Sequence, residues 1–158
     1  FDVVGFGMKI NLADVNASIG LAQIRKYEKL LTERKRVFEI YDKAFSKCEW
    51  AILPPAEVGD KKTSYHIYAL RIKDFSEEQR DAMIEEIAKK DVAVNVHFIP
   101  MPMLSFFKQL GYNIEDYQVA YNNYKHEISL PIYPQLTKEE VDYVVESVIE
   151  AYDKVRPR

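Results

Sequence analysis

Apolar residues recur at helical spacing over the first third of the chain. They run from Val15 to Phe45, most of them three or four residues apart, and no proline interrupts them before Pro54. This pattern predicts one very long helix, or two helices joined by a bend, starting at Asn11 or Asp14 in a sequence similar to a capping box. One small domain cannot cover so long a helix. We therefore expect its N-terminal part to pack against something outside this chain.

Beyond residue 54 the pattern alternates between strands and helices. Residues 54–62 are a predicted loop. Strands are predicted at 63–72, 92–99 and 128–132. Helices are expected after the capping boxes at 76–79 and 137–140, and in the shorter stretches 104–111, which ends at Gly111 as a left-handed cap, and 116–125. The fold class is therefore α+β, with a small antiparallel sheet covered by helices and a long N-terminal helix.

The strand predicted at 92–99 has two different faces. Val92, Val94, Val96 and Phe98 fall on one side, and Asn95 and His97 point to the other. A lone histidine among valines is either a structural side chain or a ligand contact, and both alternatives stay open. His66 is expected to pack within a strand, and His126 lies near a helix end, where a cation is mildly favoured. Glu127 is interpreted as surface charge.

Composition excludes several classes of function. The 158 residues suffice for one domain, and 22 basic against 25 acidic side chains give a net charge of −3. That balance disfavours nonspecific nucleic-acid binding. Three histidines and one cysteine exclude a disulfide framework and a cysteine-rich zinc site, and they fit a cytoplasmic setting. No apolar run reaches the roughly 18 residues that a membrane span needs.

Residues 5–14 carry the clearest candidate chemistry. Gly5 and Gly7 loosen the backbone, Lys9 supplies a cation, and Asn11 can stand at a helix N-terminus, where free backbone N–H groups favour an anion. The alternatives are that Asn11 is a plain N-cap and that Lys9 is a solvated side chain. Such a loop so early, with no Met before Phe1, leads us to expect that the chain begins partway through a larger protein.

The order of these segments resembles one family. Residues 9–24 resemble the "K-Y-N-M-T-D-I-x-A-A-x-G-L-x-Q-L" segment of the DegT/DnrJ/EryC1/StrS sugar aminotransferases. Further matches follow in the family's order: Arg34, Tyr41, Ser64-Tyr65-His66, Val96-His97-Phe98-Ile99-Pro100, Leu110-Gly111-Tyr112 and Ser129-Leu130-Pro131-Ile132-Tyr133-Pro134. The resemblance covers essentially the whole chain.

This resemblance implies that residues 1–158 are the C-terminal small domain and interdomain helix of a fold type I enzyme dependent on pyridoxal 5'-phosphate (PLP). Such enzymes move an amino group from glutamate or glutamine to a nucleotide-linked keto sugar, in polysaccharide or glycan precursor synthesis. The lysine that forms the Schiff base belongs to the large domain, which precedes this segment. No catalytic residue and no metal are therefore expected in this chain, and alone it should be inactive.

The resemblance also implies three site residues. Asn11 matches an asparagine that reaches the PLP phosphate of the neighbouring subunit, which implies a homodimer. Lys9 matches a lysine on the diphosphate of the sugar nucleotide, and His97 lies in the match to "H-Y-x-P" near the sugar. Ile10 and Phe98 stand where the family has tyrosine, which leaves the sugar specificity open.

Two alternatives remain at the level of sequence. The chain could be a non-catalytic nucleotide- or sugar-sensing module. The whole protein could also be a dehydratase of the same family, in which histidine replaces the Schiff-base lysine. The residue at that upstream position distinguishes them: lysine supports transamination, histidine supports dehydration, and neither supports a sensor.

Overall fold

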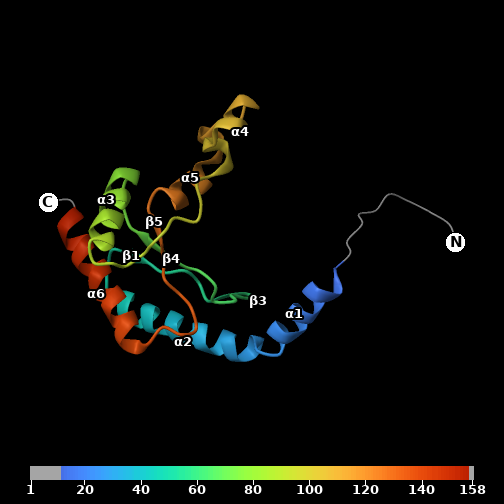
Figure 1. Cartoon of the computed structure of the whole chain (residues 1–158). Helices are drawn as coiled ribbons and strands as arrows, with labels where there is room; N and C mark the ends of the chain where they lie inside the picture. Colours follow the sequence, from blue (N-terminus) through green and yellow to red (C-terminus); the bar gives the residue numbers. More distant parts are fainter. Residues whose placement is uncertain (1–11, 157–158) are drawn as a thin grey trace, which may run out of the picture.

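The first third of the chain forms two helices that meet at a bend. The computed structural model describes residues 12–156, in which α1 (Asp14–Ile24) and α2 (Tyr27–Phe45) are separated by Arg25 and Lys26 (Figure 1). The prediction of two helices joined by a bend is thus confirmed. Of the two predicted starts the structure has Asp14, with Ala13 at the N-cap.

Helix α1 extends away from the rest of the described chain (Figure 1). None of its residues is buried, and Val15, Ile19, Leu21 and Ile24 are each more than half exposed. Its apolar side chains are spread around the helix and do not form one stripe, so a single neighbouring surface could not cover them all. The described residues leave α1 uncovered, and its packing against something outside this chain stays a prediction.

The sheet is small and antiparallel, as predicted. Its order is β1 (Ala51–Ile52), β4 (Tyr68–Ile72) and β5 (Glu127–Leu130), with Tyr68 opposite Leu130 and Arg71 opposite Glu127. The predicted loop at 54–62 contains a minor hairpin of β2 (Glu57–Val58) and β3 (Lys61–Lys62), which turns at Gly59 with a φ of +59°.

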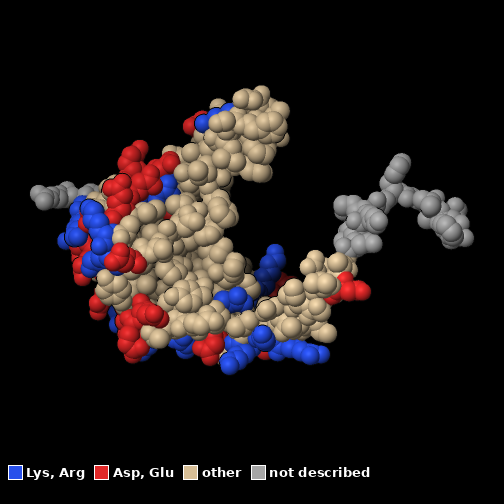
Figure 2. Space-filling model, viewed as in Figure 1, with Lys and Arg blue, Asp and Glu red and all other residues tan. Residues whose placement is uncertain are grey.

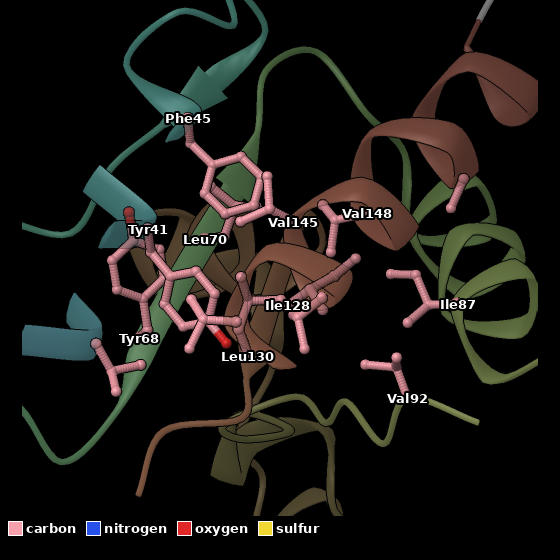
Figure 3. Close-up of a cluster of buried hydrophobic side chains, with 14 of the residues drawn as sticks. Tyr41, Phe45, Tyr68, Leu70, Ile87, Val92, Ile128, Leu130, Val145 and Val148 are labelled. Carbon is pink, nitrogen blue, oxygen red and sulfur yellow. The ribbon is translucent and has the colours of Figure 1, made fainter. Parts of the chain in front are cut away.

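Three helices cover one face of this sheet. Besides α2 these are α3 (Glu77–Ala88) and α6 (Lys138–Val155), and both predicted capping boxes are present, at Ser76 with Gln79 and at Thr137 with Glu140. Aromatic rings from α2 meet the central strand: Phe38 lies edge-on to Tyr68, with ring centroids 4.8 Å apart. Figure 3 shows this core, which draws on α2, β4, β5, α3 and α6. Burial of this apolar surface is the main stabilising term of the fold.

The chain between α3 and β5 forms a lobe that projects away from the sheet (Figure 1). It consists of two 3₁₀ turns and two short helices, in the order η1 (Met101–Met103), α4 (Ser105–Gln109), η2 (Ile114–Tyr117) and α5 (Gln118–Tyr124). Gly111 follows α4 with a φ of +88°, which confirms the predicted left-handed cap. Figure 2 shows this lobe largely free of charge, whereas acidic and basic side chains gather over α3 and α6.

Two predicted strands are corrected. In the stretch 63–72 only Tyr68–Ile72 is a strand, because Tyr65 is buried with a left-handed φ of +52° that interrupts an extended chain. The stretch 92–99 is not a strand: it forms a single bridge, between Asn95 and Ser129.

A buried arginine joins α3 to the turn before β5. Arg80 is 1% exposed, and its guanidinium donates to Asp81 Oδ1 at 2.6 Å and to the Tyr124 carbonyl at 2.8 Å. The same group lies 4.8 Å from the centroid of the Tyr124 ring and 3.6 Å from Glu77 Oε1. The Arg80 side chain therefore fixes the end of α5 and the turn that leads into β5.

We predict that Arg80→Met lowers the free energy of unfolding by about 1–3 kcal/mol, because it leaves the part-buried Tyr124 carbonyl without its donor. Urea denaturation measures this difference. Arg156→Met is the matched control, since Arg156 pairs with Asp153 at 3.5 Å on the surface and should change stability little. Equal effects of the two substitutions would contradict the role given to Arg80.

Candidate functional site

The face of the sheet opposite the helices carries polar side chains. In β4 and β5 every second residue enters the core, so the residues between them point the other way. The residues on this second face are Ala69 and Arg71 from β4, and Glu127 and Ser129 from β5. All four residues of β5 are buried, which means that this second face is also covered.

Glu127 is a buried carboxylate and not the surface charge that the sequence suggested. Its residue is 5% exposed, and Ser129 Oγ and the backbone N–H of His97 both donate to its carboxylate, the latter at 2.9 Å. Because ionised carboxylates accept strong hydrogen bonds, these two donors fix the side chain against the segment that covers the sheet.

That covering segment places His97 at the boundary of two cavities. The first, of about 360 Å³, is lined by His66, Asn95, His97 and Ser129 among others. The second, of about 440 Å³, is lined by Arg71, His97, Phe98, Asn123, Tyr124 and Glu127 together with prolines and alanines. His97 itself is exposed. The sequence predicted His97 as a site residue but gave no sign of the groups that gather around it.

His66 also belongs to the first cavity. It was expected to pack within a strand, but it is exposed and precedes β4. The left-handed backbone at the buried Tyr65 breaks the alternation just before it. Two imidazoles therefore line one cavity, although their residues lie 31 positions apart in the chain.

The second cavity combines an arginine with the Glu127 carboxylate. Arg71 is the cross-strand partner of Glu127, yet its Nη1 donates to Asn123 Oδ1 of α5 at 2.6 Å. Phe98, 71% exposed, adds an aromatic wall. This cavity can offer donors, acceptors and an apolar surface to one ligand.

His126 directly precedes β5, and its imidazole is partly buried. Its Nδ1 is buried without a hydrogen-bond partner among the described residues. Burial lowers the pKa of His126 from its ordinary value of 6.5, and the positive charges of Arg71 and Lys125 act in the same direction. The predicted preference for a cation near this helix end is therefore wrong, because desolvation outweighs it.

That the Schiff-base lysine lies outside this chain stays a prediction. None of the described lysines is buried, and none lines either cavity beside His97. Residues 12–156 also contain no cluster of three or more His, Cys, Asp or Glu able to hold a metal, and no helix in that range could cross a membrane. Lys9 and Asn11 lie outside the described residues, so their predicted roles stay predictions.

Solved structures identify the class of this fold. A putative sugar aminotransferase, Spr1654 from Streptococcus pneumoniae, in its PLP-form matches with a TM-score of 0.88 at 35% identity, over 99% of this chain and 40% of that one. The described chain therefore has the fold of one part of a PLP-dependent aminotransferase.

The family follows from the sequence comparison. The model of the DegT/DnrJ/EryC1/StrS aminotransferase family matches residues 1–149, and the chain belongs to this family. It is 30% identical to the spore coat polysaccharide biosynthesis protein SpsC of Bacillus subtilis, over 94% of this chain and 39% of that protein. It is 28% identical to the UDP-4-amino-4,6-dideoxy-N-acetyl-β-L-altrosamine transaminase of Campylobacter jejuni, over 98% and 41%. The chain thus spans about 40% of the length of these relatives.

We predict that stability falls as the pH drops below about 6.5, in part because of His126. Since the folded pKa lies below the ordinary value of 6.5, the unfolded chain binds the proton first. The contribution of His126 is complete above that value and is lost as the pH falls through the folded pKa. Urea midpoints measured between about pH 7.5 and 5 should fall less steeply in His126→Gln than in the parent. His66→Gln, which removes an exposed imidazole, is the control and should keep the parent's slope.

Proposed function

We propose that this chain is part of an enzyme that transfers an amino group from glutamate or glutamine to a keto sugar linked to a nucleoside diphosphate, with PLP as cofactor. The observation that carries this proposal is the family match over residues 1–149. It is supported by the Campylobacter relative, a transaminase of a UDP-linked sugar, and by SpsC, which points to polysaccharide precursors. A cytoplasmic setting is part of the proposal.

The geometry supports a role for this chain in holding the sugar. His97 stands where two cavities meet, and Arg71, Glu127, Asn123 and Phe98 offer the donors, acceptors and aromatic surface that bind sugar hydroxyls and ring faces. We assign His97 to the sugar, and Lys9 to the diphosphate.

In this proposal the lysine that binds PLP covalently belongs to the large domain, outside this chain. PLP supplies the electron sink for amino transfer when it is bound. Asn11 is assigned to the PLP phosphate of the neighbouring subunit, which makes the active protein a symmetric homodimer. The chain alone should therefore show no turnover.

The full-length protein, supplied with PLP, glutamate and a UDP-linked 4-keto sugar, tests this proposal. We expect formation of 2-oxoglutarate together with an amino sugar, followed by mass spectrometry; glutamine in place of glutamate tests the second donor. A product that has lost a hydroxyl group and gained no nitrogen would instead show a dehydratase. Tight binding of the nucleotide sugar without any product would show a sensor.

We predict that Asn11→Ala in the full-length protein weakens PLP retention more than it lowers folding stability, because an amide donor to the phosphate is lost. Cofactor absorbance after dialysis and the thermal midpoint without PLP measure the two effects. Asn122→Ala, an exposed change on α5, is the control and should retain PLP as the parent does. Unchanged cofactor occupancy in Asn11→Ala would count against the role across the dimer.

A further inference from the structure

We propose that Glu127 is a positioning residue: its carboxylate captures the backbone N–H of His97, ends strand pairing there, and holds the 96–100 segment so that His97 stands between the two cavities. This inference rests on the proposed function, in which His97 contacts the sugar. Neither the family match nor any relative's name assigns a role to Glu127.

The hydrogen bonds around Ser129 show where a further strand would run. Asn95 and Ser129 exchange two backbone hydrogen bonds, with N···O distances of 3.2 and 2.7 Å, on the outer edge of β5. In an antiparallel ladder the next pair of this kind lies two residues further along each strand. It would join His97 to Glu127, and the two residues would exchange both backbone bonds.

The backbone pair of His97 with Glu127 is replaced by side-chain hydrogen bonds. The His97 N–H donates to Glu127 Oε2 at 2.9 Å, not to the backbone carbonyl of Glu127. That carbonyl lies 3.5 Å from Nη1 of the buried Arg80. The donor and the acceptor of one of the two backbone bonds in that pair are therefore taken by side chains, and pairing stops after one bridge. This is the physical reason that the strand predicted at 92–99 does not form.

The Glu127 side chain is suited to this task because it is buried and held at both oxygens. Ser129 Oγ donates to Oε1, while Oε2 takes the His97 N–H. Within residues 12–156 the carboxylate forms no ion pair, since Arg71 opposite it bonds to Asn123 instead. A buried carboxylate is costly unless it is hydrogen-bonded, and these two donors are what keep it in place.

After Asn95 the chain leaves the edge of β5, and this departure shapes both cavities. Phe98 and Ile99 are 71% and 49% exposed, whereas residues of a fourth strand would pack along β5. Because the segment lifts away, His97 borders both cavities and Phe98 borders the second. Losing the carboxylate should therefore misplace His97 without removing it.

Three substitutions in the full-length protein test this inference. Glu127→Ala removes the acceptor, Glu127→Asp keeps the charge but shortens the side chain by one methylene, and Glu127→Gln keeps an oxygen at the same reach. We expect the KM for the nucleotide sugar to rise about tenfold in the Ala and Asp variants, as for loss of one hydrogen bond to a charged group. The Gln variant should stay near the parent. Glu49→Ala, at an exposed residue after α2, is the control.

A comparison of the two half-reactions separates positioning from general damage. The first takes the amino group from glutamate, and the second transfers it to the keto sugar. The reaction of glutamate with the PLP form, followed by absorbance, should keep its rate in all variants, while the step that consumes the keto sugar weakens in Ala and Asp. Rescue by Asp but not by Gln would overturn the proposal, because charge and not reach would then matter. An equal loss in both half-reactions would also overturn it.

Hydrogen–deuterium exchange tests the positioning even if the proposed activity fails. Peptides covering residues 92–100 should exchange faster in the Ala and Asp variants than in the parent and Gln variants. If no variant, the parent included, aminates a sugar but this pattern holds, the proposed function is wrong and the anchoring by Glu127 stands. Equal exchange in the parent and all variants would refute the anchoring, whatever the activity.

Discussion

The pairing of β4 with β5 is the constraint on which the rest of the structure depends. Its register places Tyr68 opposite Leu130 and Arg71 opposite Glu127. A slip of one residue would exchange the two faces of a strand, since successive side chains point to opposite sides. The same register therefore sends apolar side chains toward α2, α3 and α6 and polar ones toward the cavities. Core and candidate site are consequences of one set of backbone hydrogen bonds.

Helix α2 ties this pairing to the chain beyond it. The Tyr68 hydroxyl donates to Asp42 Oδ1 at 2.8 Å, and the Tyr41 hydroxyl donates to the Pro131 carbonyl at 2.8 Å. Burial raises the pKa of both phenols, so they remain neutral donors at physiological pH. The second bond fixes the chain as it leaves β5, and Pro131 lines the first cavity. The Tyr41 hydroxyl thus links helix α2 to the lining of the first cavity.

The elements that local sequence determines were predictable. The capping boxes at Ser76 and Thr137, the helices they open and the left-handed cap at Gly111 depend on residues within a few positions of one another. The family motifs likewise pointed to His97. What the sequence could not show is that a carboxylate 30 residues away takes the N–H of His97. Alternating apolar residues look the same whether a backbone carbonyl or a side chain accepts that hydrogen bond, so 92–99 resembled a strand.

Glu127 was misjudged for a related reason. A glutamate is far more often exposed than buried, and nothing in its immediate sequence distinguishes it from surface charge. Its burial follows from three distant partners: Arg71 across the sheet, the 92–100 segment over it, and Arg80, which holds the turn before β5. The same partners leave the site with acceptors, donors and two imidazoles but no lysine along its cavities. The cavities beside His97 are thus lined by groups that can orient a polar ligand, which is the role that the proposed function gives to this part of the protein.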